Sequence, residues 1–217
     1  MKLIDIDQQF STHYKELLAI QERGYKQLYD YSYNLAEDEI TACVINRMQS
    51  FWFFNVNNNK NILERHSNTV AADFFTETCL LYLKAYFQSK HGLLVKSEVS
   101  IVKSRNAIRP DISIWKEDSL IAAIELKVND GWKRKSIIEH LQHREEIIKT
   151  HYPNAFFGVI AFWNFFDTSL LEFDTKYISL LHWNPNENHP RTGSRIESLI
   201  LAIENHISSK TNHEFKL

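Results

Sequence analysis

Two apolar segments separated by a short charged break constrain the fold of this chain more than any other feature. Residues 109–115 and 121–127 alternate or run apolar and are rich in β-branched side chains. The tripeptide at 117–119 between them, Glu-Asp-Ser, has the composition of a turn. The pattern therefore predicts a β-hairpin, and we expect a three-residue loop that pairs Lys116 with Leu120.

This register predicts where the side chains of three charged residues lie. Asp111 falls directly opposite Glu125, and Lys127 shares their face because side chains alternate along a strand. Two carboxylates so placed repel each other. A slip of one residue would relieve the repulsion but would set Asp111 among the apolar residues of the other face. That other face is the predicted core face, with Ile112, Ile114, Ala122, Ile124, Leu126 and Val128.

The predicted carboxylate pair needs compensating positive charge, which a divalent cation supplies. Mg²⁺ takes a few carboxylate oxygens and keeps several waters, and this suits a site that acts on phosphate. Lys127 beside the cation would orient or deprotonate the attacking water and offset charge in the transition state. A plainer interpretation stays open. It is a surface hairpin in which Asp111 caps a strand and Glu125 pairs with Lys127.

Pro110-Asp111 followed by Glu125-Leu126-Lys127 resembles the signature of the PD-(D/E)xK phosphodiesterases, the restriction-endonuclease-like superfamily. The likeness covers residues 69–162. It implies an α/β fold with a mixed central sheet flanked by helices, and a metal-dependent nuclease that hydrolyses phosphodiester bonds of nucleic acid, with DNA as the first expectation. It also implies that Asp111, Glu125 and the carbonyl of Leu126 hold Mg²⁺, or Mn²⁺ as a substitute, while Lys127 positions the water.

The resemblance suggests further site residues on the helices beside the hairpin. The helix before the first core strand commonly supplies an acid in this superfamily, and Glu77 is the candidate, although a solvent-exposed glutamate fits equally well. Lys133 and Lys135 stand at a helix start, an unfavourable place for cations unless an anionic ligand passes there. With Arg109, they are candidates to hold backbone phosphate. Gln142 on the same helix is the candidate polar residue facing the site.

The rest of the chain divides into a helical region and the nuclease-like domain. Residues 8–55 predict two helices, the first capped by Ser11. An asparagine-rich stretch at 55–61 predicts a loop, so we expect a helical region over residues 1–60, packed on a core domain over 61–217. The core is expected to contain a helix ended by Gly92. Strands at 93–103, 156–163 and 177–183, a helix at 132–151 and a closing helix from Ser194 are also expected.

Composition narrows the class of protein. The chain has 217 residues, 44% hydrophobic and 24% charged, which is ordinary for a globular domain. Its net charge of −2 argues against a nucleic-acid enzyme, but residues 96–135 carry nine basic side chains against six acidic ones. Cys43 and Cys79 suggest neither a disulfide framework nor a zinc site. No apolar run is long enough to span a bilayer, and acids occupy the amino terminus, so we expect a cytoplasmic protein.

The sequence is also compatible with two other classes of function. The chain could be a catalytically silent nucleic-acid-binding or complex-forming protein that keeps the nuclease fold. An unrelated α/β enzyme is less favoured, because the sequence has no G-x-S-x-G elbow, phosphate loop or dinucleotide fingerprint, and only five glycines. The partner expected of either favoured class is nucleic acid rather than a membrane. A homodimer is possible, since restriction-like enzymes that cut both strands are often dimers.

Overall fold

The computed structural model describes residues 2–37, 39–65, 71–103, 107–128, 137–163, 175–182 and 191–214, and of residues 191–192 and 210–214 it describes the backbone. Helices and strands follow each other in the order α1 (Leu3–Asp30), α2 (Glu39–Asn57), the short π-helix η1 (Asn58–Ile62), α3 (Ala72–His91), β1 (Leu94–Ser97), β2 (Ile112–Lys116), β3 (Ser119–Lys127), α4 (Ile137–His151), β4 (Phe156–Trp163), β5 (Tyr177–His182), β6 (Arg191–Thr192) and α5 (Ile196–Glu214).

The strands form one mixed sheet in the order β1-β2-β3-β4-β5-β6. The first three are antiparallel neighbours, β3, β4 and β5 are parallel, and β6 returns antiparallel to β5. Helix α4 makes the crossover between the parallel strands β3 and β4. The predicted strand at 156–163 has the bounds of β4, and its interior position explains its unbroken apolar sequence, because both of its faces are covered. The expectation of an α/β fold with a mixed sheet flanked by helices is confirmed.

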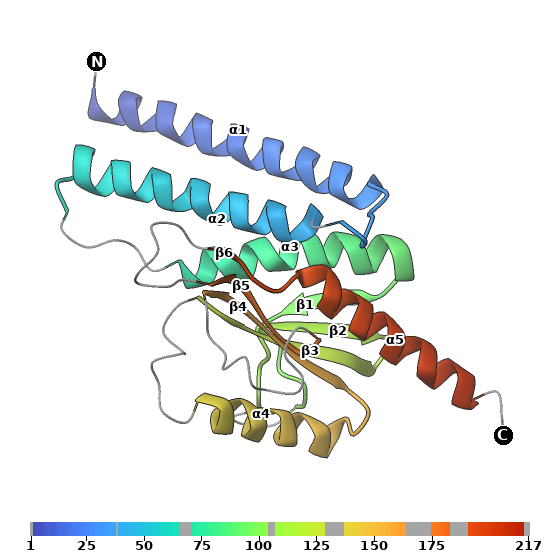
Figure 1. The fold of residues 1–217 in the computed structure, drawn as a ribbon. Coiled ribbons are helices and arrows are strands. Elements are labelled where there is room, and N and C mark those ends of the chain that lie inside the picture. The colour runs from blue at the N-terminus through green and yellow to red at the C-terminus, as the bar shows by residue number, and fades with distance from the viewer. Residues whose placement is uncertain are drawn as a thin grey trace.

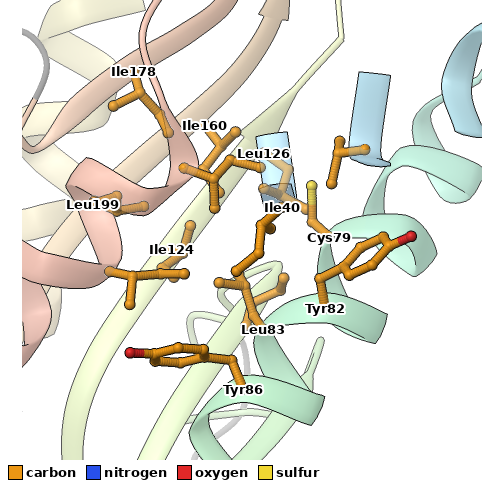
Figure 2. Close-up of a cluster of buried hydrophobic side chains, with 14 of the residues drawn as sticks. Ile40, Cys79, Tyr82, Leu83, Tyr86, Ile124, Leu126, Ile160, Ile178 and Leu199 are labelled. Atoms are coloured by element: carbon orange, nitrogen blue, oxygen red, sulfur yellow. The ribbon is translucent and has the colours of Figure 1, made fainter. Parts of the chain in front are cut away.

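Helices cover the two faces of the sheet unequally (Figure 1). Helices α2, α3 and α5 enclose the larger core against one face, while α4 lies on the other face over a smaller core. Figure 2 shows part of the larger core, where Leu83 and Tyr86 of α3 gather with Ile124 of β3 and Leu199 of α5. Helix α1 is the outermost layer and has no buried residue. The face of the sheet under α4 is therefore the less heavily covered one.

The predicted hairpin is present, with one correction at its turn. Ile112 pairs with Ile124, and Ile114 with Ala122, as the predicted register requires. The loop has two residues rather than three, so that Lys116 pairs with Ser119 instead of Leu120. A shift of one residue after Ile114 restores the predicted pairing towards the far end of the hairpin. All six residues of the predicted core face belong to the larger core.

The amino-terminal helices differ from the prediction at their ends. The first helix begins at Leu3, eight residues before Ser11, where the Lys2 backbone N–H donates to the Asp5 carboxylate at 2.8 Å. The asparagine-rich stretch continues α2 into η1 instead of forming a loop. Asn55 and Asn57 donate through their side-chain amides to the carbonyls four residues earlier. These amides therefore bond to carbonyls of the helix and do not compete with its backbone hydrogen bonds. This explains why the loop prediction was wrong.

The strand expected over 93–103 is also shorter, because β1 ends at Ser97 and Glu98 has a φ of 52° in the left-handed region. The backbone N–H of Glu98 donates a hydrogen bond to the carbonyl of Pro110 at 3.2 Å. Gly92 ends α3 with a φ of 63°, as predicted. The residues directly after Ser97 consequently turn out of the sheet, and the next strand begins at Ile112.

Helices α2 and α5 cap each other although they lie far apart in the sequence. The buried carboxylate of Glu197 accepts the N–H groups of Ile40 at 2.6 Å and Thr41 at 3.0 Å, and the Thr41 hydroxyl at 2.5 Å. In return the Thr41 hydroxyl accepts the N–H of Ile196 at 2.8 Å. Donors that have no partner inside their own helix are satisfied in this way. Hydrogen bonds therefore join the amino-terminal helical region, through α2, to α5, the last helix of the core.

Candidate functional site

The structure brings Asp111, Glu125 and Lys127 together on the face of the sheet that carries α4. Asp111 directly precedes β2, and the other two residues end β3. The Lys127 Nζ lies 3.4 Å from Oε2 of Glu125 and 3.8 Å from Oδ2 of Asp111. Both carboxylates therefore reach the same atom, as the predicted register requires. The cation between them in this structure is the lysine ammonium.

Asp111 closes the ladder between β2 and β3. Its Oδ2 accepts the backbone N–H of Leu126 at 2.6 Å, and its own carbonyl accepts the Ser97 hydroxyl at 2.8 Å. Its side chain is partly exposed. Asp111 thus caps the strand, as in the plainer interpretation. At the same time its carboxylate is partly exposed beside Lys127, and no hydrogen bond to its Oδ1 is found within the described residues.

Glu125 is the buried member of the cluster, with a side chain only 3% exposed. Its Oε1 accepts Nη2 of Arg144 at 2.5 Å, and its Oε2 faces Lys127. Burial raises the pKa of Glu125, and the neighbouring Asp111 raises it further, against the opposing effect of Arg144 and Lys127. A carboxylate in this position is stable as an anion only beside positive charge.

Arg144 is a site residue that the sequence interpretation missed. It lies on α4, and its Nη2 also donates to the carbonyl of Arg109 at 3.0 Å, joining the helix to the segment before Asp111. A signal for it exists in the sequence. Leu141 and Ile148 of α4 are fully buried, and position 144 falls between them on the same stripe of the helix. A cation beside a buried stripe favours an acidic partner, and Glu125 is the partner that the structure shows.

Glu77 does not join this cluster. It lies on α3, which covers the opposite face of the sheet, and its side chain is 52% exposed. Its Oε1 accepts the Gln21 amide at 3.0 Å and lies 3.9 Å from Arg47. Glu77 therefore lines a groove of about 560 Å³ between α1 and α3. The structure therefore does not bring Glu77 to Asp111 and Glu125, and its position is the solvent-exposed one that the sequence also allowed.

The residues predicted to bind nucleic acid differ in where they lie relative to the site. Gln142 is exposed, and it lies two residues from Arg144, about 200° around the helix, so it faces away from Glu125. Gln142 therefore does not face the site as expected. The polar residue of α4 that contacts Glu125 is Arg144, two positions further along the helix. Arg109 is exposed beside the site and donates from its Nε to the Ser100 hydroxyl at 3.1 Å. Lys133 and Lys135 lie outside the described residues.

The donor atoms at this site suit a hard cation. The available ligands are the carboxylates of Asp111 and Glu125 and the carbonyl of Leu126, which are all oxygens of the kind that Mg²⁺ prefers. Within the described residues there is no cluster of three or more His, Cys, Asp or Glu side chains that could hold a metal ion. The donors fit a cation that keeps several waters.

Comparisons with known proteins add no family to this picture. No protein-family model matches the chain, and neither the curated proteins nor the solved structures include a significant match. Among the described helices, none has both the length and the apolar character needed to span a membrane. Function must therefore be argued from the site itself.

Proposed function

We propose that this protein is a metal-dependent nuclease that hydrolyses phosphodiester bonds of nucleic acid, with DNA as the first substrate to test. The observation that carries the proposal is the convergence of Asp111, Glu125 and Lys127, with both carboxylates within 4 Å of one ammonium. The order α3-β1-β2-β3-α4-β4 agrees with the core that the PD-(D/E)xK resemblance implies. The motif residues also lie at the end of the hairpin, beside the exposed Arg109.

Each residue has a definite task in this proposal. Asp111, Glu125 and the Leu126 carbonyl would hold Mg²⁺, for which Mn²⁺ can substitute. When bound, such a cation neutralises the carboxylates and polarises a phosphate oxygen. Lys127 orients the attacking water and offsets the charge that develops on the phosphate. Arg109 holds the backbone next to the reacting group through its exposed guanidinium.

One observation favours a second candidate, a nucleic-acid-binding protein that keeps this architecture without cleaving. The carboxylates are already satisfied by the protein itself, because Arg144 and Lys127 pair with Glu125 while the Leu126 N–H binds Asp111. A closed ion-pair network needs no metal. This candidate predicts binding of nucleic acid with no cleavage in any divalent metal.

A cleavage panel separates the two candidates. Single- and double-stranded DNA and RNA are incubated with the wild-type protein in Mg²⁺, Mn²⁺, Ca²⁺ or EDTA. The nuclease proposal expects cleavage in Mg²⁺ or Mn²⁺ that is abolished by Lys127→Ala and by Asp111→Asn. The asparagine keeps an oxygen for the Leu126 N–H and so preserves the local structure. Lys116→Ala removes an equal charge at the turn end of β2 and should retain activity. Binding without cleavage under every condition would refute the proposal.

A further inference from the structure

The contact between Arg144 and Glu125 uses only a small part of the donor capacity of the guanidinium. Within the described residues a single nitrogen, Nη2, makes both hydrogen bonds of this side chain, one to the Glu125 carboxylate and one to the Arg109 carbonyl. Arginine binds carboxylates and phosphates most strongly when two nitrogens act together as a fork. The pair is therefore an end-on contact, which is not the strongest form of this interaction.

One of the remaining nitrogens of Arg144, Nε, has no hydrogen-bond partner within the described residues. This nitrogen is buried. A buried donor left unpaired is unfavourable, so the observed arrangement does not exhaust what this side chain can bind. The side chain is 22% exposed, which means that it also borders solvent. A ligand that offers two acceptor oxygens would satisfy the guanidinium better than Glu125 does.

The charges at the site balance without a metal. Asp111 and Glu125 contribute two negative charges, and Lys127 and Arg144 contribute two positive ones within 4 Å of them. A divalent cation that takes Oε1 of Glu125 competes with Arg144 for that oxygen, whereas Oε2 faces Lys127. The cation also places two further positive charges beside the guanidinium. A phosphodiester group is the natural compensation, because it brings negative charge and two acceptor oxygens together.

We propose that Arg144 is a displaceable counter-ion, which holds Glu125 in the metal-free protein and moves to a phosphate group of the nucleic acid when a divalent cation takes its place. The inference rests on the proposed metal-dependent nuclease function and adds a residue and an order of events to it. Because Arg144 also holds the Arg109 carbonyl, its release frees the segment before Asp111 at the same step. Binding of the cation and binding of the nucleic acid are then coupled, each strengthening the other by the same factor.

Metal affinity in the absence of substrate tests the first half of the proposal. Mn²⁺ is titrated into the wild type, Arg144→Ala, Arg144→Gln and Lys116→Ala, and free Mn²⁺ is followed by electron paramagnetic resonance. Removal of the competing guanidinium should tighten Mn²⁺ binding about tenfold in both Arg144 variants, the amount that one charge-assisted hydrogen bond represents. Lys116→Ala reports the general effect of losing one positive charge. Thermal unfolding in EDTA confirms that each variant is folded, and the glutamine variant serves if the alanine variant is not.

Coupling between the two ligands tests the second half. The same titrations are repeated with a nuclease-resistant phosphorothioate duplex present. The wild type should bind Mn²⁺ at least about fivefold more tightly with the duplex than without it. Arg144→Ala should lose most of this gain. Arg144→Lys keeps the charge but not the fork, so it should bind Mn²⁺ alone as the wild type does and still lose much of the coupling.

The outcomes separate this inference from the function on which it rests. If the wild type binds Mn²⁺ and cleaves nucleic acid, but the Arg144 variants bind Mn²⁺ no more tightly than Lys116→Ala, Arg144 is a structural ion-pair partner and the inference is overturned alone. If neither the wild type nor the Arg144 variants bind Mn²⁺ and none cleaves, the proposed nuclease function fails and the inference fails with it. Removal of a purely structural arginine would raise metal affinity no more than Lys116→Ala does.

Discussion

Replacement of Glu197 by alanine is expected to weaken the joint between the amino-terminal helices and the core. The Glu197 carboxylate is 1% exposed and accepts three hydrogen bonds, from two N–H groups in the first turn of α2 and from the Thr41 hydroxyl. Each lost cap costs about 1 kcal/mol, and each buried donor left unpaired costs about 1–3 kcal/mol. Three donors at the lower end of this range give an expected loss of unfolding free energy of about 3 kcal/mol or more. Against a typical total of about 5–15 kcal/mol, this would leave the fold marginal.

Urea unfolding, followed by circular dichroism and tryptophan fluorescence, measures this change. Glu197→Gln keeps one carbonyl oxygen for the two N–H groups and loses the charge, so it should cost about 1–2 kcal/mol. Glu146→Ala on α4 removes an exposed glutamate and should cost less than about 0.5 kcal/mol. Hydrogen exchange should accelerate first in α2 of Glu197→Gln. A loss below about 1 kcal/mol in Glu197→Ala would refute the argument that this joint stabilises the molecule.

Arg144→Ala should destabilise the metal-free protein by about 3 kcal/mol at neutral pH, because it leaves the Glu125 carboxylate buried without its closest cation. In a Glu125→Gln background the same change should cost far less, and equal losses in both backgrounds by chemical unfolding would contradict this. Burial opposes ionisation of Glu145, but hydrogen bonds from Lys149 and Lys176 outweigh it and lower its pKa, so its stabilising contribution is present above the ordinary glutamate pKa and is lost as pH falls through the lowered value. The stabilities of wild type and Glu145→Gln should therefore differ at pH 7 and converge in acid, and a difference independent of pH would disprove the linkage. Phe162→Ala should lower the free energy of unfolding by about 3–5 kcal/mol, because the ring is fully buried in the larger core, and a loss below about 1 kcal/mol would show that the site is not close-packed.

The parts of the structure that the sequence predicts are those governed by local periodicity. Alternation along the hairpin determined which side chains share a face, and so it brought Asp111 and Glu125 to one side and Ile112 and Ile124 to the other. The error at the turn did not propagate, because a bulge absorbs one residue without reversing the faces beyond it. The apolar run of β4 and the end of α3 at Gly92 are equally local features.

The features that the sequence alone left undecided depend on contacts between distant segments. Glu77 lies away from the site because α3 packs on the opposite face of the sheet, where its side chain meets α1 and α2. Arg144 meets Glu125 only because the crossover places α4 above the end of β3. Glu197 reaches Thr41 across 156 residues of chain. Side-chain period follows from backbone geometry and can be read within one element, whereas the partner of a charged side chain is chosen by the packing of whole elements against one another.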